Sequence, residues 1–280
     1  MPVDIGRLPW YNEEKHMRGN LQMKIGVCAS PDNLPQLAEL GYDYFEANFS
    51  WLAGLDEDSF RQNTEKVERY SVPAEAYNMF FRGGMKLYDP SGDQTPLLKE
   101  IGIYVERAFS RAEAWGGKVA VIGSGYVRAV PEGMTQLQAD AQFARVLYVC
   151  GSAAEKHGMK VVVEPLSDCN YIQTVGEASA AARKANHPAV GVLVDFFHHS
   201  TVGEDPESLP AYADLLWHVH YGRPVDRWAP VPGDEDKLAY LAGILKQCPK
   251  AERISLECSW HPDFETAIRT AEPLMEVFRQ

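Results

Sequence analysis

Short β-rich runs and longer amphipathic stretches alternate eight times along this chain. Strands are predicted at 24–28, 42–48, 72–80, 118–125, 160–165, 190–195, 217–222 and 253–259. Helices are predicted at 33–40, 56–70, 96–115, 135–157, 174–186, 206–215, 235–247 and 263–278. Several runs, such as VGVLVD at 190–195, are continuously apolar, which is typical of parallel strands that are buried on both faces. Eight strand–helix units in roughly 250 residues predict a single (β/α)8 TIM barrel.

A doubly wound open sheet is the main competing architecture, because it has the same alternation of strands and helices. The dinucleotide-binding form of that sheet carries G-x-G-x-x-G after its first strand, whereas this chain has only GSG, at 123–125, after the fourth. No Ser/Gly-rich linker divides the chain, so we expect one catalytic domain at 23–280. Residues 1–22 precede the first predicted strand and are interpreted as an N-terminal extension or a cap on the bottom of the barrel.

The charge balance argues against nucleic acid as a partner. The chain has 39 acidic and 27 basic residues and a net charge of −12, whereas proteins that bind nucleic acid gain affinity from Lys and Arg contacts to phosphates. Its five cysteines form no C-x-x-C pair, which indicates reduced thiols. No signal peptide or long apolar run is recognised. We expect a cytoplasmic protein that binds a small molecule, contacts no membrane and is free to form a homo-oligomer.

Acidic and histidine side chains interrupt the predicted strands at their carboxyl ends, which in a TIM barrel meet at the catalytic mouth. These residues are Glu46, Glu164, Asp195, His220 and Glu257. Those on the last four strands combine three carboxylates with one imidazole, a donor set that suits Mn²⁺, Mg²⁺ or Co²⁺ better than Zn²⁺. The sequence therefore predicts one divalent ion at the mouth, with Mn²⁺ preferred. The alternative is an acidic surface cluster paired with Arg or Lys.

Four later stretches of the chain carry a family resemblance. They are EPLSDCNYIQTVGEA at 164–178, NHPAVGVLVDFFHHS at 186–200, HVHYGRPVDRWAPVPGDED at 218–236 and ISLECSW at 254–260. Together with GSGYVRAVPEG at 123–133, they resemble the xylose-isomerase-like barrel superfamily, whose members include sugar isomerases, sugar epimerases and one type of AP endonuclease. The resemblance extends from Met23 to the C-terminus and implies metal-dependent chemistry on a sugar.

The resemblance also implies roles for individual residues. In the ketose 3-epimerase branch, the metal ligands match Glu164, Asp195, His220 and Glu257. His198 matches a substrate-contacting histidine, and Arg227 matches an arginine that follows the metal histidine, although Arg223 also fits the spacing. Asn170 stands where that branch often has a glutamate, which indicates a substrate other than a free ketohexose.

Further residues are expected around the ligands. Glu46 and Asn78 end the second and third predicted strands, where the family tends to contact substrate. Trp260 follows the last metal glutamate and is predicted either to wall the pocket or to pack inside the protein. His218 lies two residues before His220 on the same side of the strand, and we expect it to support His220.

The implied chemistry is proton abstraction next to a carbonyl, with a divalent ion stabilising the enediolate. Glu164 and Glu257 are the predicted acid/base pair. Returning the proton gives a sugar isomerase or epimerase, whereas losing a β-hydroxyl gives an inosose-type dehydratase. We predict the former, with the dehydratase as the alternative. A non-catalytic sugar-binding barrel or an AP-endonuclease-like phosphodiesterase is less favoured, because the quartet of ligands is intact and the early strands lack the extra histidines of a three-zinc cluster.

Overall fold

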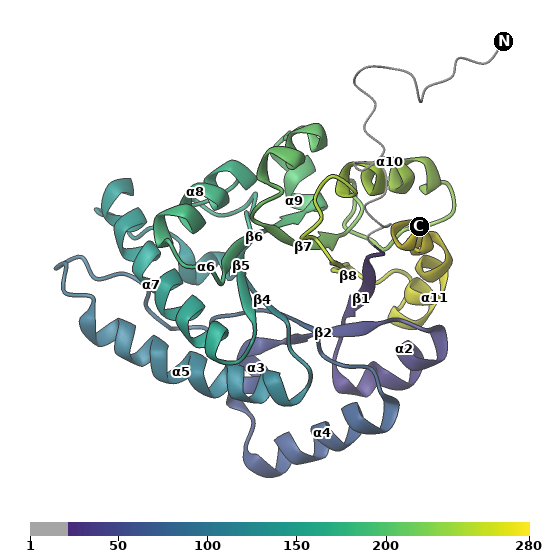
Figure 1. Ribbon diagram of the computed structural model, residues 1–280, viewed down its shortest axis with the longest axis horizontal. Coiled ribbons are helices and arrows are strands. Elements are labelled where there is room, and N and C mark those ends of the chain that lie inside the picture. The colour runs from purple at the N-terminus through teal and green to yellow at the C-terminus, as the bar shows by residue number, and fades with distance from the viewer. Residues whose placement is uncertain (1–21) are drawn as a thin grey trace, which may run out of the picture.

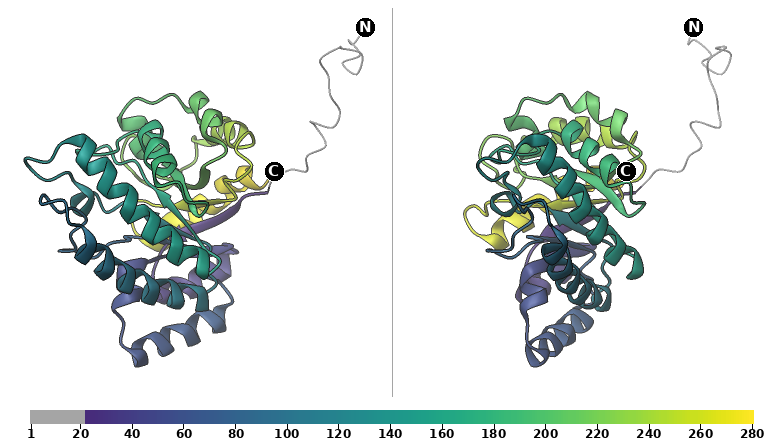
Figure 2. Two further views of the ribbon diagram at one scale, coloured as in Figure 1. Left: turned by 60° about the vertical axis from the view of Figure 1, so that its left-hand side comes forward. Right: turned by 90° about the vertical axis from the view of Figure 1, so that its left-hand side faces the viewer.

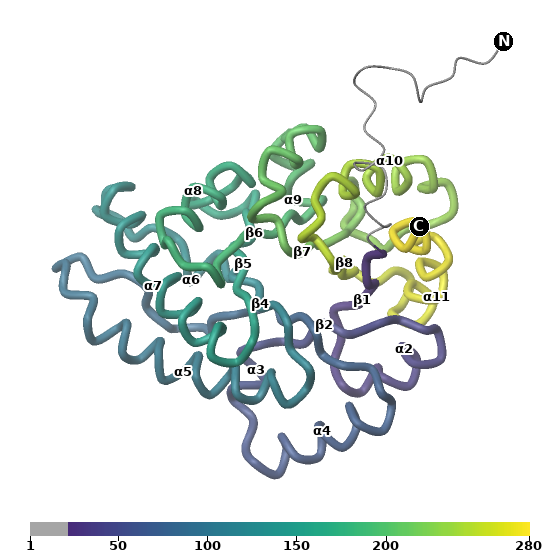
Figure 3. Tube along the Cα trace, in the orientation of Figure 1, coloured from purple at the N-terminus to yellow at the C-terminus, as the bar shows by residue number. Residues whose placement is uncertain are grey.

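Eight parallel strands close into a barrel in the computed structural model, which describes residues 22–280 (Figure 1). The strands are β1 (Lys24–Cys28), β2 (Tyr44–Asn48), β3 (Ala76–Asn78), β4 (Val119–Ile122), β5 (Lys160–Val163), β6 (Val190–Asp195), β7 (Leu216–Tyr221) and β8 (Arg253–Leu256). The last strand lies beside the first (Figure 3), with Ile25 opposite Ile254. This closure confirms the predicted TIM barrel. The extension predicted at 1–22 lies almost entirely outside the described residues.

Helices surround the barrel on its outer side, as the views in Figure 2 show. The α-helices are α2 (Leu34–Leu40), α3 (Phe49–Gly54), α4 (Glu57–Tyr70), α5 (Thr95–Ala114), α6 (Gly125–Arg128), α7 (Gln136–Lys156), α8 (Val175–Ala185), α9 (Phe196–Thr201), α10 (Glu235–Leu245) and α11 (Phe264–Met275). Within the described part of the chain, three 3-10 helices accompany them, η2 (Pro31–Asn33), η3 (Pro206–Tyr212) and η4 (Glu276–Arg279). None of the helices within residues 22–280 is long and apolar enough to cross a membrane.

The four-residue helix α6 was not predicted, and neither were two short helices that follow strands directly, α3 and α9. Each begins directly after a strand, because the last side chain of the strand caps the helix: Asn48 accepts a hydrogen bond from the Trp51 amide, and Asp195 accepts one from the Phe197 amide. The helix predicted at 206–215 is instead the 3-10 helix η3, which contains Pro210. The ring of a proline replaces the backbone N–H, so the residue cannot donate the hydrogen bond that continues an α-helix.

Side chains fill the barrel below its mouth. Those that pack together inside it are Tyr44, Ala76, Val119, Val121, Val162 and Leu193. At the amino ends of the strands, the buried carboxylate of Glu75 accepts a hydrogen bond of 2.6 Å from Arg253 Nε. Because packed side chains and this ion pair occupy the lower part of the barrel, its carboxyl end is left for binding.

Candidate active site at the barrel mouth

A cavity of about 790 Å³ opens at the carboxyl end of the barrel. Its lining includes Glu164, Asp168, Asn170, His198, Arg227 and Glu257. A hollow of about 900 Å³ lies between helices α5 and α7, but it contains none of the site residues predicted from the sequence. We therefore take the mouth of the barrel as the candidate active site.

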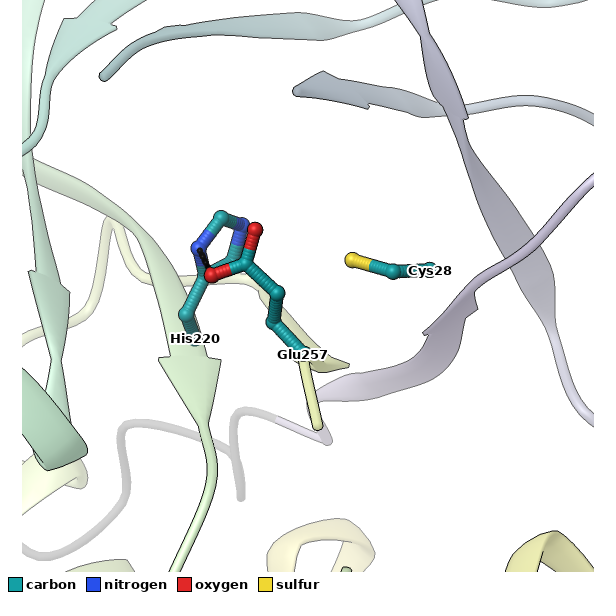
Figure 4. Close-up of side chains that lie close together, drawn as sticks. All are labelled: Cys28, His220 and Glu257. Carbon is teal, nitrogen blue, oxygen red and sulfur yellow. Dashed lines mark ion pairs between the residues drawn. The ribbon is translucent and has the colours of Figure 1, made fainter. Parts of the chain in front are cut away.

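Four predicted ligands meet at the mouth of the barrel: Glu164 and Glu257 line the cavity, and the buried Asp195 and His220 lie beside them. Glu164 follows β5, Asp195 ends β6, His220 lies in β7 and Glu257 follows β8. One ligand atom from each of these residues, called the quartet below, lies within 4.8 Å of the others. His220 Nδ1 is 3.2 Å from Glu164 Oε1 and 3.3 Å from Glu257 Oε2. Figure 4 shows the Glu257 carboxylate over the His220 ring. Donors from four successive strands thus point at one spot.

The electrostatics of the quartet suit a bound cation. Burial, reinforced by Glu257 and Glu164, raises the pKa of Asp195 to about 8. Burial and Glu257 also raise the pKa of Glu164. Three carboxylates and an imidazole therefore crowd a buried space in which their negative charges are unfavourable unless a positive charge joins them. This donor set fits a divalent ion that prefers oxygen ligands.

Arg227 partly offsets the negative charge. Its Nη2 lies 2.6 Å from Glu257 Oε2 and 3.3 Å from Asp195 Oδ2. Burial raises the pKa of Glu257, but His220 and Arg227 outweigh it and lower that pKa to about 2. Asp195 directs its other oxygen, Oδ1, to the Phe197 and His198 amides. This capping leaves Oδ2 free to face Arg227 and the other quartet side chains.

Glu46 lies beneath the cavity rather than in its lining. Its Oε1 is 2.9 Å from His220 Nε2, and its Oε2 is 2.9 Å from His218 Nε2. All three side chains are fully buried. If both imidazoles donate to this carboxylate, the Nδ1 lone pair of His220 is free to face the quartet. The substrate contact predicted for Glu46 is therefore replaced by contacts to two histidines, and His218 stands in the supporting position predicted for it.

His198 and Arg227 both line the cavity, as expected for groups that contact substrate. His198 Nδ1 accepts a hydrogen bond from the Ser167 amide, so its Nε2 carries the proton in the neutral ring. Burial and the nearby Arg227 lower the pKa of His198 to about 4, which keeps the ring neutral at physiological pH. Arg223, the alternative arginine, lies 3.6 Å from both Asp226 and Asp234.

Two residues predicted to contact substrate, Asn170 and Trp260, instead use their side chains for contacts within the protein. Asn170 lines the cavity, but its side-chain amide exchanges hydrogen bonds of 2.9 and 3.1 Å with the backbone of Val130. Trp260 packs edge-on against Phe264, with ring centroids 4.9 Å apart, and is not among the residues that line the cavity. This packing is the second of the two roles predicted for Trp260.

Arg128 has a role that the sequence did not indicate. Its fully buried guanidinium donates hydrogen bonds to the backbone oxygens of Glu164, at 2.6 Å, and Ile122, at 3.2 Å. Asn78 was expected near substrate and lies with its Nδ2 3.3 Å from Glu257 Oε1. Both residues therefore hold ligand-bearing segments in place.

Gly123 makes room for the first carboxylate of the quartet. A Cβ atom at this position would lie 2.3 Å from Glu164 Oε2, far inside van der Waals contact. From the sequence, GSG at 123–125 is an incomplete nucleotide-binding motif and the start of a stretch that carries the family resemblance, and neither observation indicates a role for Gly123. A glycine after the fourth strand is visible in the sequence. Its role becomes clear only from the structure, because the Glu164 side chain, which follows the neighbouring strand, occupies the space where a Cβ atom of residue 123 would lie.

Gly123→Ala is expected to weaken binding of a divalent ion by about 10-fold or more, since even supporting groups of metal sites have effects of that size. The added methyl meets the end of a flexible side chain, so the protein should fold while the Glu164 carboxylate moves. Isothermal titration with Mn²⁺ measures the change. Gly243→Ala in α10 is the matched control, because its Cβ would meet nothing within 4 Å. Unchanged affinity in Gly123→Ala would contradict the proposed crowding.

The fold and the site together place this chain in a known family. It belongs to the xylose isomerase-like TIM barrel family, whose model matches residues 34–279. This confirms the resemblance described from the sequence. Among characterised proteins, the 3-dehydroshikimate dehydratase of Pseudomonas putida is 26% identical over 236 residues. The match covers 77% of this chain and 34% of the dehydratase, so this chain spans about a third of the length of that relative.

Several solved structures share the fold. The 3-keto-D-glucoside 4-epimerase YcjR of E. coli has a TM-score of 0.74 at 19% identity, covering 91% of this chain and 99% of that chain. The D-allulose 3-epimerase of Methylomonas sp., in complex with D-allulose, has a TM-score of 0.71 at 17% identity, covering 92% and 95%. The IolI protein with a bound zinc atom has a TM-score of 0.64 at 19% identity, covering 91% and 98%.

Proposed function

We propose that this protein is a divalent-metal-dependent isomerase or epimerase that acts on a sugar or sugar-derived ketone. The observation that carries the proposal is the convergence of Glu164, Asp195, His220 and Glu257, two of which, Glu164 and Glu257, line the cavity at the barrel mouth. The family membership and the epimerases with the same fold support it. The reaction class is removal of a proton from the carbon next to a carbonyl, followed by return of a proton.

The quartet would hold the ion. Its three carboxylates favour Mn²⁺, with Mg²⁺, Co²⁺ and Zn²⁺ as further candidates. When bound, the ion would supply positive charge that stabilises the enediolate as negative charge develops on the substrate oxygens. The IolI structure holds zinc within the same fold, which supports a metal-binding role for the mouth of the barrel.

The side chains of the protein would transfer the proton and position the substrate. Glu257 is the more exposed carboxylate of the acid/base pair, at 21% against 7% for Glu164, and would take the proton from carbon. Glu164 would return a proton from its own side. Arg227 and the Nε2–H of His198 would donate hydrogen bonds to substrate oxygens and so fix the reacting carbon near Glu257.

A dehydratase is the second candidate, and one observation favours it. The 26% identical relative is a 3-dehydroshikimate dehydratase. Loss of a β-hydroxyl from the enediolate or enolate would follow the same proton abstraction, so Glu257 would keep its role. The two functions differ in what leaves the substrate rather than in how the reaction begins.

Deuterium incorporation tests the proposal and separates its two forms. Mn²⁺-loaded protein would be incubated in heavy water with ketohexoses, inososes, hydroxypyruvate and 3-dehydroshikimate, and the products followed by NMR. We expect metal-dependent deuterium at the carbon next to the carbonyl of at least one substrate. Conversion of 3-dehydroshikimate to a dihydroxybenzoate would establish the dehydratase instead. Metal-dependent incision of an abasic DNA duplex, without exchange on any of these ketones, would contradict both.

A further inference from the structure

Cys28 ends β1, which lies beside β8, the strand that Glu257 follows. Its Sγ points toward the space occupied by His220 and Glu257 (Figure 4), and one ligand atom from each of the three residues lies within 4.8 Å of the others. In the closed barrel, Val27 is opposite Leu256 and Cys28 is opposite Glu46. The thiol therefore sits between the last quartet residue and the buried Glu46.

The sulfur of Cys28 accepts a hydrogen bond, whereas the thiols of Cys258 and Cys169 donate one. Asn78 Nδ2 donates to Cys28 Sγ at 3.4 Å and also lies 3.3 Å from Glu257 Oε1. By contrast, Cys258 donates to the Tyr221 carbonyl and Cys169 donates to the Gly125 carbonyl. Because the Asn78 amide donates to Cys28 Sγ, it would stabilise negative charge on the sulfur when the thiol becomes a ligand. The same amide also holds the sulfur beside a carboxylate that can serve as a second ligand.

We propose that Cys28, His220 and Glu257 form a second, overlapping ligand set that binds Zn²⁺, with Co²⁺, which accepts both oxygen and sulfur donors, as its spectroscopic probe. This inference rests on the proposed metal-dependent function and adds a form of regulation to it. Mn²⁺ and Mg²⁺ prefer oxygen donors and take the carboxylate-rich quartet, whereas a thiolate favours softer ions. Binding to the second set releases the thiol proton to solvent as the sulfur becomes a thiolate ligand.

The two ligand sets exclude each other, because they share His220 and Glu257. An ion bound to the thiolate would also engage Glu257, the proposed base, and would leave Glu164 and Asp195 without their cation. Zn²⁺ is therefore expected to compete with Mn²⁺ and to yield a less active protein. Cys28 would give the site a means of distinguishing one class of metal from another.

Cobalt spectroscopy tests whether the thiol is a ligand. Metal-free wild-type protein, Cys28→Ser and the matched control Cys258→Ser would each be titrated with Co²⁺ under reducing, oxygen-free conditions. We expect a near-ultraviolet sulfur-to-cobalt charge-transfer band in wild type and in Cys258→Ser. Cys28→Ser should lack that band and keep the weaker visible bands of bound cobalt. Stoichiometric Co²⁺ without a charge-transfer band in wild type, or a band that survives in Cys28→Ser, would overturn the inference.

Affinity measurements separate ligation from a merely structural role. Cys28→Ser is expected to weaken Zn²⁺ by at least about 10-fold, the effect that even a supporting group of a metal site can have, and to leave Mn²⁺ affinity within about threefold. Equal weakening of both ions would count against the second ligand set. If neither Mn²⁺ nor Co²⁺ binds the wild-type protein, the proposed metal-dependent function fails as well. If Mn²⁺ and Co²⁺ both bind but no sulfur-to-cobalt charge-transfer band is seen, only the inference about Cys28 is wrong.

Discussion

Glu257→Gln is expected to lower turnover by about 10²–10⁴-fold, the usual contribution of a general acid or base. Glutamine preserves the shape of the side chain and one oxygen ligand, but it cannot accept the substrate's proton. Exchange of the carbon-bound proton with heavy water should fall in parallel with turnover. Because Glu257 also belongs to the quartet, metal content must be measured on the same sample, and the informative protein is one that retains its ion.

Two further variants make the result interpretable. Glu164→Gln should also lose turnover, since the second carboxylate returns the proton. Glu265→Gln, on the exposed side of α11, is the matched control and should behave as wild type. A metal-loaded Glu257→Gln protein that exchanges protons at nearly the original rate would show that Glu257 is a ligand only. The base would then be sought at His198, which lines the same cavity.

Glu46→Gln is expected to weaken Mn²⁺ binding by about 10–100-fold, although Glu46 is not itself in the quartet. The carboxylate accepts from His220 and His218 at 2.9 Å each. Glutamine has a single acceptor oxygen, so one of the two imidazoles must instead accept from its NH₂ group and move its proton to Nδ1. If that ring is His220, the proton occupies the nitrogen that faces the quartet and blocks it.

Nitrogen-15 NMR of the histidine rings gives this prediction a readout beyond affinity. In metal-free wild type, His220 should be protonated at Nε2, and in Glu46→Gln its Nε2 protonation should decrease. Glu75→Gln is the matched control, because Glu75 is also a buried carboxylate in an ion pair but lies at the opposite end of the barrel. A Glu46→Gln protein with wild-type Mn²⁺ affinity and an unchanged tautomer would show that the buried pairings only stabilise the fold.

Much of the architecture could be predicted because the hydrophobic pattern and the barrel arithmetic agree. Several continuous apolar runs mark strands buried on both faces, and eight alternating strand–helix units leave little choice of topology. The short helices α3 and α9 escaped prediction because each is only six residues long and is started by a capping side chain rather than by periodicity. Asp195 illustrates the difficulty, since one carboxylate is both a helix cap and a quartet residue.

The sequence could predict which residues belong to the candidate site, but not which of them are buried beneath the cavity. Strand ends identify which residues reach the mouth, and Glu164, Asp195, His220 and Glu257 do converge there. The same rule placed Glu46 among them, yet its side chain points into the barrel, where two histidines hold it. Cys28 and Gly123 were not predicted, because their importance depends on contacts between neighbouring strands that the sequence does not specify.

The junction of β8 with β1 has a consequence for how the protein can be assayed. These strands are the last and first in the chain, they close the barrel, and Glu257 and Cys28 extend from their adjoining ends. An ion held by residues from both β8 and β1 would be bound only while the barrel is closed, so metal binding would be linked to closure. Ligands that bind only the folded state raise its melting temperature by an amount that grows with the logarithm of their concentration divided by their dissociation constant. Thermal denaturation could therefore rank metals for this protein before any substrate is known.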